Sequence, residues 1–443
     1  MPDGDDGPDG DDGPGARPAR SRVVALVVLV TLAVGIGAVI QRNSGATRVD
    51  PPAVAAAVTP TGTGKPLTPF ETAELALTAQ AAALTAGDER AWMAAVDPGQ
   101  PKLRVRYRSL YQNLRALHVS HFEYHAYIRD LAEPGGPVEV GIAASYCFSV
   151  VTCPGYSDAD REGPPRISQV LTLKPVRGRY VITRIAKANR PSHLQPAPWE
   201  NGGLVFAQGD RVTVAAARSE ARHLRKALRL AEKAAVLNDR FAGYVRNPQL
   251  RYRVYLASDE AWRTWYGRPS RTWSVGYEIP LNDAGGDVVL RMSRISGDAE
   301  LRNVLQHELA HVVTLTSRTR RNRDDQWLQE GIAEYIGALP GSATGSGHRS
   351  RVRGAVHSRR PPTSIAAKSL ADDAGDATVD TFYGLGHFAV ECMAVKFGQR
   401  RLFEFVRLRL RAGDTYDEAS RKAFGKPFAV VDRSCLTWIR QHA

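Results

Sequence analysis

Cysteine is scarce in this chain, and its cysteines lack the spacing that binds metal. Only 4 of the 443 residues are cysteine, and no CxxC pair occurs, which excludes a metal cluster held by paired thiolates. An even number of cysteines allows two disulfides in three connectivities, and four buried thiols are the alternative. Pairing neighbours in the sequence predicts Cys147–Cys153 and Cys392–Cys435, one in each folded domain proposed below.

Charge is absent from the run Val23 to Ile40. A helix over this run, at about 1.5 Å per residue, comes close to the roughly 30 Å of a bilayer core. A cleaved signal peptide is the alternative, but no small-residue cleavage site directly follows Ile40, so we predict an uncleaved signal anchor. Arginines 17, 20 and 22 precede the run and indicate a cytoplasmic N-terminus. The prediction is a single-pass protein of the cell membrane with its folded part extracytoplasmic.

Acidic residues are outnumbered, yet no nucleic-acid-binding motif accompanies the basic excess. The 59 Lys and Arg against 46 Asp and Glu give a formal net charge of +13. Two clusters stand out, at 318–323 and at His348 to Arg360, and we expect both in loops. Solvated loops are the simpler interpretation. Attraction to an anionic substrate, envelope polymer or lipid head group is the alternative, and nucleic acid is not an expected partner.

What the chain does contain is His307-Glu308-Leu309-Ala310-His311. On a helix, His307 and His311 point to the same side and can hold one Zn²⁺. Glu308 stands at the edge of that face, where a carboxylate can accept a proton from the water that the metal activates. Ser296 or Asp298 is the expected cap of this helix.

A second motif, Trp327 to Tyr335 (WLQEGIAEY), supplies a third ligand. A catalytic zinc commonly takes two histidines and one glutamate, so we predict Glu330 as that ligand if its helix packs on the HExxH helix. Gly331 and Ala333 are small enough to permit that approach. Glu334, one turn later, is placed to accept the other ring N–H of a ligand histidine.

HELAH, then residues 312 to 329, then WLQEGIAEY resembles the gluzincin metallopeptidases, which include thermolysin-like enzymes and zinc aminopeptidases. The resemblance implies that His307, His311 and Glu330 bind zinc, that Glu308 is the base, and that Glu334 supports a ligand. A metzincin is excluded, because Thr314 and Ser317 stand where its motif needs glycine and histidine.

The same resemblance implies two further roles. A tyrosine or histidine downstream stabilises the oxyanion in this family, which favours Tyr383 and, as second choice, His387. A strand before the zinc helix pairs with extended substrate, which points to Val288 to Arg291. Apart from the resemblance, the Gly/Ser/Arg-rich stretch from Pro340 to Pro362 is long enough to predict a mobile loop that acts as a lid.

The rest of the chain divides by composition into five segments. We predict a disordered cytoplasmic tail at 1–22, the transmembrane anchor at 23–40, a Pro/Ala/Thr-rich linker at 41–67, an α+β domain at 68–195 and the metallopeptidase domain at 196–443. The overall class is α+β, with a mainly helical catalytic domain that carries a small sheet.

The 68–195 segment shows helical spacing first and strand-like segments after it. This order is similar to the nuclear-transport-factor-2-like, cystatin-like cone fold. A ligand pocket and a spacer or pro-domain are both compatible with it. His118, His121 and His125 are close in sequence, but we interpret them as structural residues without a nearby carboxylate partner.

Together these features predict a membrane-anchored, extracytoplasmic zinc metallopeptidase that cleaves a peptide or protein substrate. The GxMxN motif with which zinc aminopeptidases read a free amine is not apparent upstream of HELAH, which favours an endopeptidase. The alternative is an anchored module that binds an envelope ligand and has a vestigial or structural zinc site. The intact Glu308 argues against that alternative, because a structural site needs no base.

Overall fold

The computed structural model describes residues 66–129, 133–149, 152–157, 162–186, 197–266, 274–315, 322–371 and 373–443. The predicted tail, the predicted anchor at 23–40 and nearly all of the predicted linker lie outside this part of the chain. Among the helices that are described, none combines the length and the apolar character needed to cross a bilayer. The anchor therefore stays a prediction.

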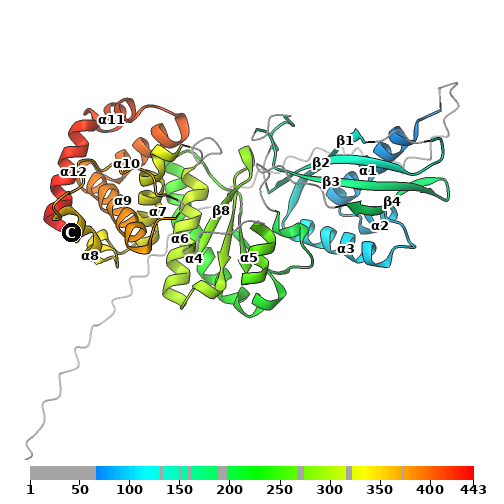
Figure 1. Cartoon of the computed structure of the whole chain (residues 1–443), viewed down its shortest axis with the longest axis horizontal. Helices are drawn as coiled ribbons and strands as arrows, with labels where there is room; N and C mark the ends of the chain where they lie inside the picture. Colours follow the sequence, from blue (N-terminus) through cyan, green and yellow to red (C-terminus); the bar gives the residue numbers. More distant parts are fainter. Residues whose placement is uncertain are drawn as a thin grey trace, which may run out of the picture. The chain divides into compact units, whose positions relative to one another are not determined.

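Three helices open the described chain and pack on an antiparallel sheet, as the sequence predicts (Figure 1). Thr68 and Glu71 form a capping box at the start of the first helix, and Gly87, at φ +80°, ends it. The helices are α1 (Pro69–Ala86), α2 (Glu89–Ala94) and α3 (Pro101–Ala116). The strands, in spatial order, are β1 (Val119–Ile128), β2 (Val138–Phe148), β3 (Arg166–Val176) and β4 (Arg179–Ala186).

Alternation along β1 sends its side chains to two faces of this sheet. Phe122 is buried in the core with the helices, and the Tyr124 hydroxyl donates to Gln80 of α1. The intervening residues His121, Glu123 and His125 share the other face. The Glu123 carboxylate lies 3.5 Å from His121 Nε2 and 3.6 Å from His125 Nε2, so the prediction that these histidines lack a carboxylate partner is wrong.

A second, five-stranded sheet has the order β5-β6-β7-β9-β8. Its strands are β5 (Val205–Gln208), β6 (Val212–Ala216), β7 (Tyr252–Ala257), β8 (Gly276–Pro280) and β9 (Gly286–Arg291). β6, β7 and β9 run parallel, and β8 pairs antiparallel with β9. The prediction that Val288 to Arg291 pairs with substrate is wrong, because β9 has a neighbour on both sides. The strand at this edge of the sheet is β8.

Both faces of the second sheet are buried. On one face, α4 (Leu224–Tyr244) and α6 (Asp298–Thr314) pack against alternate residues such as Val254 and Val288. On the other face, Tyr255 and Ala257 belong to the same apolar core as Phe122 and the first three helices. Arg253 and Asp287 form a buried ion pair at 2.6 Å on that face. The described part of the 68–195 segment thus packs directly on the second sheet.

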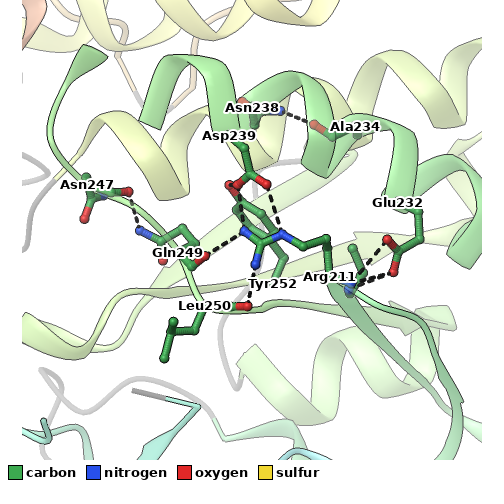
Figure 2. A network of polar contacts seen from close by, with 10 residues as sticks. Arg211, Glu232, Ala234, Asn238, Asp239, Asn247, Gln249, Leu250 and Tyr252 are labelled. Atoms are coloured by element: carbon green, nitrogen blue, oxygen red, sulfur yellow. Dashed lines mark hydrogen bonds and ion pairs between the residues drawn. The ribbon is translucent and has the colours of Figure 1, made fainter. Parts of the chain in front are cut away.

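A polar network fixes α4 to the sheet (Figure 2). Arg211, just before β6, bonds both carboxylate oxygens of Asp239 at 2.8 and 3.0 Å and the backbone carbonyls of Gln249 and Leu250. The carboxylate of Glu232, also on α4, accepts the backbone N–H of Arg211. Because a planar guanidinium can make two parallel hydrogen bonds to a carboxylate in few orientations, these bonds fix the position of α4 along β6 and β7.

Outside the two sheets, the described chain is mainly helical, as predicted. Two of the helices, α5 (Asp259–Tyr266) and α8 (Arg349–Val356), have eight residues each. The others are α7 (Gln326–Ala338), α9 (Asp376–Phe397), α10 (Gln399–Val406), α11 (Tyr416–Phe424) and α12 (Phe428–His442), with a π-helical segment at Arg407–Ala412. Short 3₁₀ turns occupy Pro198–Glu200, Arg218–His223, Asn282–Ala284, Met292–Arg294, Arg323–Asp325 and Ala343–Gly345.

Two further sequence predictions meet different outcomes. Both disulfides, Cys147–Cys153 and Cys392–Cys435, are confirmed. The expectation of a mobile loop from Pro340 to Pro362 is wrong, because this stretch contains α8, whose Val352 and Val356 are buried one turn apart against the C-terminal helices. The apolar signal of two valines among arginines was too sparse to predict a helix.

Candidate metal centre

The HExxH motif lies on α6, as predicted, in the half of the helix that is buried. Its expected cap is wrong: α6 begins after Gly297, which provides no side-chain bond, and Glu300 instead accepts the backbone N–H and hydroxyl of Ser296. α7 packs against α6 on one side and α9 on the other (Figure 1). These contacts bring Glu330 of α7 over the histidine face of α6.

Small residues govern how closely these helices approach. Gly337 faces the Cβ of His307, and a side chain at this position would crowd the ligand histidine. Gly331, predicted to face the HExxH helix, instead crosses Gly386 of α9, where a Cβ would meet the Gly386 carbonyl at 2.6 Å. Small residues are thus needed at these crossings, as predicted, but Gly331 packs against α9 and not against the HExxH helix.

Three nitrogen and oxygen atoms converge at one point between α6 and α7. The Nε2 atoms of His307 and His311 are 3.1 Å apart, and the Glu330 Oε2 atom lies 3.5 and 3.4 Å from them. Ligands about 2.0–2.1 Å from a tetrahedral zinc ion lie about 3.3 Å from one another. The three donors have both the chemistry and the separations of a His₂Glu zinc site.

The surroundings of these donors are largely closed to solvent. Their side chains are 14 %, 10 % and 16 % exposed, for His307, His311 and Glu330 in that order. Burial alone would raise the pKa of Glu330, but the two imidazoles lower it far below its ordinary value. Glu330 is therefore a carboxylate at any physiological pH, which is the form that binds a cation. Within the described residues, this is the group of His, Cys, Asp and Glu whose donor atoms lie close enough for one metal ion.

Glu334 lies where the sequence predicts. Its Oε1 atom is 3.0 Å from Nδ1 of His307. A carboxylate there holds the proton on Nδ1 and leaves the Nε2 lone pair directed at the metal position. The next contact was not predicted, because residue 348 was expected in a loop. His348 Nε2 is 3.7 Å from Glu334 Oε2, and its Nδ1 is 3.6 Å from Asp380.

Glu308 is 7 % exposed and lies beside the edge strand β8. A Cβ at Gly276 of β8 would meet the Glu308 carboxylate, so a larger residue there would force that carboxylate to move. Burial raises the pKa of Glu308 above its ordinary value, and the neighbouring imidazoles only partly offset this. The carboxylate of Glu278, also on β8, adds to the rise. A carboxyl group with a raised pKa suits proton transfer in both directions.

Tyr383 of α9 lies on the ligand side of the centre. Its ring is stacked over His307 with centroids 6.2 Å apart, and its hydroxyl hydrogen-bonds the Glu330 carboxylate. Burial and that carboxylate raise the pKa of Tyr383 well above its ordinary value, so the phenol keeps its proton as a donor. His387 is 1 % exposed, and burial lowers its pKa to about 4, which leaves it neutral.

Contacts that the sequence did not predict hold α6 and α7 in register. Gln306, beside the first ligand, donates to the carbonyls of Ile336, Gly337 and Leu339 at the end of α7. Arg411 donates to the carbonyl of Leu315, which caps α6. The positions of Gln306 and Arg411 in the sequence do not indicate these bonds, because their partners lie at the ends of other helices.

Arg409, in the same π-helical segment as Arg411, serves the start of α7. It bonds Asp325 at 2.8 Å, and the Tyr416 hydroxyl bonds the same carboxylate at 2.7 Å. Tyr416 also accepts the indole N–H of Trp327. The π-helical segment thus secures the end of α6 and the beginning of α7, the two helices that carry the ligands.

No family model matches the sequence, and no curated protein matches it. Among solved structures, the chain is similar to a mutant two-domain M1 zinc metallopeptidase bound to L-arginine, at 15% identity and a TM-score of 0.33. The similarity covers 72% of this chain and 65% of that one. It is also similar to a mutant M1 zinc metallopeptidase of Deinococcus radiodurans bound to a Tyr-Ser-Ala substrate, at 13% identity and a TM-score of 0.33, covering 74% and 94% of the two chains. The chemistry rests on the residues of the site, not on these scores.

Proposed function

We propose that this chain is a zinc-dependent peptidase. The observation that carries the proposal is the convergence of His307, His311 and Glu330 on one point, with the unused carboxylate of Glu308 beside it. A structural zinc site takes four protein ligands, whereas a catalytic one keeps a position free and needs a base. Zinc bound here would supply a Lewis acid for the substrate carbonyl and would make water acidic enough to ionise near neutral pH.

The residues of the chain divide the reaction between them. Glu308 accepts a proton from the attacking water and later donates it to the nitrogen of the leaving amine. The Tyr383 hydroxyl donates a hydrogen bond to the oxygen of the tetrahedral intermediate. Extended substrate pairs with the edge strand β8, whose Gly276 brings the peptide backbone next to Glu308.

Glu308→Gln tests the reaction directly. The amide keeps the size of the side chain but cannot accept the proton, so we expect kcat to fall by about 10⁴-fold or more while bound zinc stays near one per chain. Metal analysis and hydrolysis of a quenched fluorescent peptide library by the full chain measure the two quantities. Glu260→Gln, at an exposed position of α5, is the matched control. Unchanged hydrolysis in Glu308→Gln would exclude Glu308 as the base.

We further propose endopeptidase action, because the GxMxN motif is not apparent. One observation favours aminopeptidase action as a second candidate: the buried Glu278 on β8 lies on the same side of the strand as Gly276 and close enough to raise the pKa of Glu308. A carboxylate there could pair with the free amine of a substrate. Cleavage of N-acetylated peptides as fast as free ones supports an endopeptidase, whereas loss of cleavage on acetylation supports an aminopeptidase.

We also propose that residues 23–40 anchor the chain in the cell membrane with the catalytic part extracytoplasmic. The uncharged run and the two disulfides, which persist in oxidising compartments, support this. Partition of the full chain with membranes after a carbonate wash, and protease accessibility of intact cells, test it. The alternative of an envelope-binding module predicts ligand binding that survives chelation and no zinc-dependent cleavage.

A further inference from the structure

Five arginines on α8 and just after it have no side-chain partner among the residues that the structure describes. Val352 and Val356 form its buried face. The arginines are all exposed: they are Arg349, Arg351, Arg353, Arg359 and Arg360, the last two just after the helix. Within the described residues, none of these guanidinium groups takes part in an ion pair or a side-chain hydrogen bond. We call this set the α8 arginines.

The sequence around them offers no neutralising charge. No Asp or Glu occurs between Glu334 and Asp372. Arg349 and Arg353 stand one helical turn apart, where like charges repel. The α8 arginines therefore do not stabilise the fold, and their charge is available to an external anion.

α8 is seated next to the metal centre. A Cβ at Gly384 of α9 would collide with both His348 and Val352, so α8 lies close against α9 at the residue that follows Tyr383. His348, the residue directly before α8, contacts Glu334, which contacts the ligand His307. The α8 arginines thus begin at the border of the site and not on a remote face.

Exposure increases outward along this path. The side chains of His307, Glu334 and His348 are 14 %, 22 % and 28 % exposed, and Asp380 beside His348 reaches 47 %. These side chains thus become more exposed from the metal centre toward the start of α8. A peptide that extended beyond its scissile bond in this direction would meet the α8 arginines.

We propose that the α8 arginines bind an acidic segment of the peptide substrate, which deepens the proposed function and rests on it. Their fixed positive charge beside the site matches runs of Asp and Glu that flank the cleaved bond. An anionic lipid surface is the less favoured occupant. Binding to a membrane surface usually combines basic residues with exposed apolar ones, and none of the exposed large apolar side chains lies between residues 340 and 371.

The test compares peptides that share one cleavable centre. One carries a run of glutamates before it, one carries the run after it, and one carries glutamines in both places. For the full chain at low salt, we expect one of the acidic peptides to have a KM about tenfold below that of the glutamine peptide. Raising the salt to about 1 M, where the Debye length is about 3 Å, should remove the difference.

The variant Arg349→Gln/Arg351→Gln/Arg353→Gln should bring the ratio of the two KM values close to one. Its matched control is Arg225→Gln/Arg229→Gln/Lys233→Gln, which removes the same charge from exposed positions of α4. The control should keep the tenfold ratio. An equal loss of the ratio in the control, or no preference for either acidic peptide in the parent chain, overturns the proposal.

A binding assay separates this proposal from that of the peptidase. Fluorescence anisotropy of the same labelled peptides needs no hydrolysis. Tighter binding of the acidic peptide without any cleavage would refute the peptidase and support the acidic-segment site. Equal cleavage of all peptides would support the peptidase and refute the acidic-segment site. Vesicles of phosphatidylglycerol complete the test: if the α8 substitutions abolish vesicle binding and leave the peptide ratio unchanged, the surface belongs to lipid and the proposal is wrong.

Discussion

Two groups of histidine and glutamate in this chain have the same composition and opposite geometry. His307, His311 and Glu330 form the metal group, whose donor atoms converge. His121, Glu123 and His125 form the strand group on β1, where both imidazoles face the same carboxylate at 3.5 and 3.6 Å. In the described part of the chain, the metal group meets the distance requirement for one ion and the strand group does not.

The difference follows from the backbone. Residues four apart rise about 6 Å along a helix and about 13 Å along a strand. Helical histidines at this spacing can therefore reach one ion, whereas the strand histidines can only flank the glutamate between them. The metal group is also more buried, since Glu123 is 53 % exposed and Glu330 is 16 % exposed. Residue types indicate a candidate metal site, but whether the donor atoms can reach one ion depends on whether the residues lie on a helix or on a strand.

Removing Glu330 gives the largest expected contrast between the two groups. Glu330→Ala leaves two imidazoles without a carboxylate, so we expect bound zinc to fall from about one per chain to near none, with loss of hydrolysis. Elemental analysis of the purified full chain measures this. The matched variant Glu123→Ala should keep its zinc. Full zinc in Glu330→Ala would refute the His₂Glu site, and zinc loss in Glu123→Ala would make the strand group a second metal site.

Substitution of one tyrosine beside each group extends the comparison to the rate of hydrolysis. Each group has one stacked ring, Tyr383 on His307 and Tyr156 on His125. Tyr383→Phe removes the oxyanion donor, and we expect kcat to fall about 10²–10³-fold with KM and zinc content little changed. Tyr156→Phe should leave kcat within about twofold. Steady-state kinetics on one peptide give both values. Equal effects of the two substitutions would remove Tyr383 from the mechanism.

We expect substitution of Glu334 to have the smallest of these effects. Glu334→Gln retains the shape of the contact to His307 but loses its charge, so we expect zinc affinity to fall about 10–100-fold. Competition with a fluorescent chelator measures the affinity, and added zinc should restore most of the activity. Activity that stays low at saturating zinc would show that Glu334 acts on the reaction itself and not through His307.

The sequence predicted the parts of the site that local periodicity determines. His307 and His311 share a face because they lie one helical turn apart. Glu330 and Glu334 lie one turn apart on the next helix for the same reason. The neighbours of these helices depend on chain segments far away, so periodicity could not reveal them. Gly331 was predicted to pack against α6 but packs against α9. Strand β9 was predicted to pair with substrate, but β8 is the strand at this edge of the sheet.

The helix α8 illustrates the limit most clearly. Its sequence alternates arginine with small residues, which predicts an exposed loop when only composition is considered. The structure forms a helix because Val352 and Val356 find a place against α9 and α12. The contact of His348 with Glu334 depends on that docking, and it is the reason that a polar residue outside both motifs belongs to the site.

The core shared by the first sheet, its helices and the far face of the second sheet bears on the order in which this protein acquires its structure. Synthesis proceeds from the N-terminus, so residues 68–186 leave the ribosome before β6, β7 and β9. They offer a ready apolar surface to Tyr255, Ala257 and Val289 when these emerge. The first sheet and its helices then cover this face of the second sheet as it forms, and a chain that began at residue 196 would leave the face exposed to solvent and prone to aggregation.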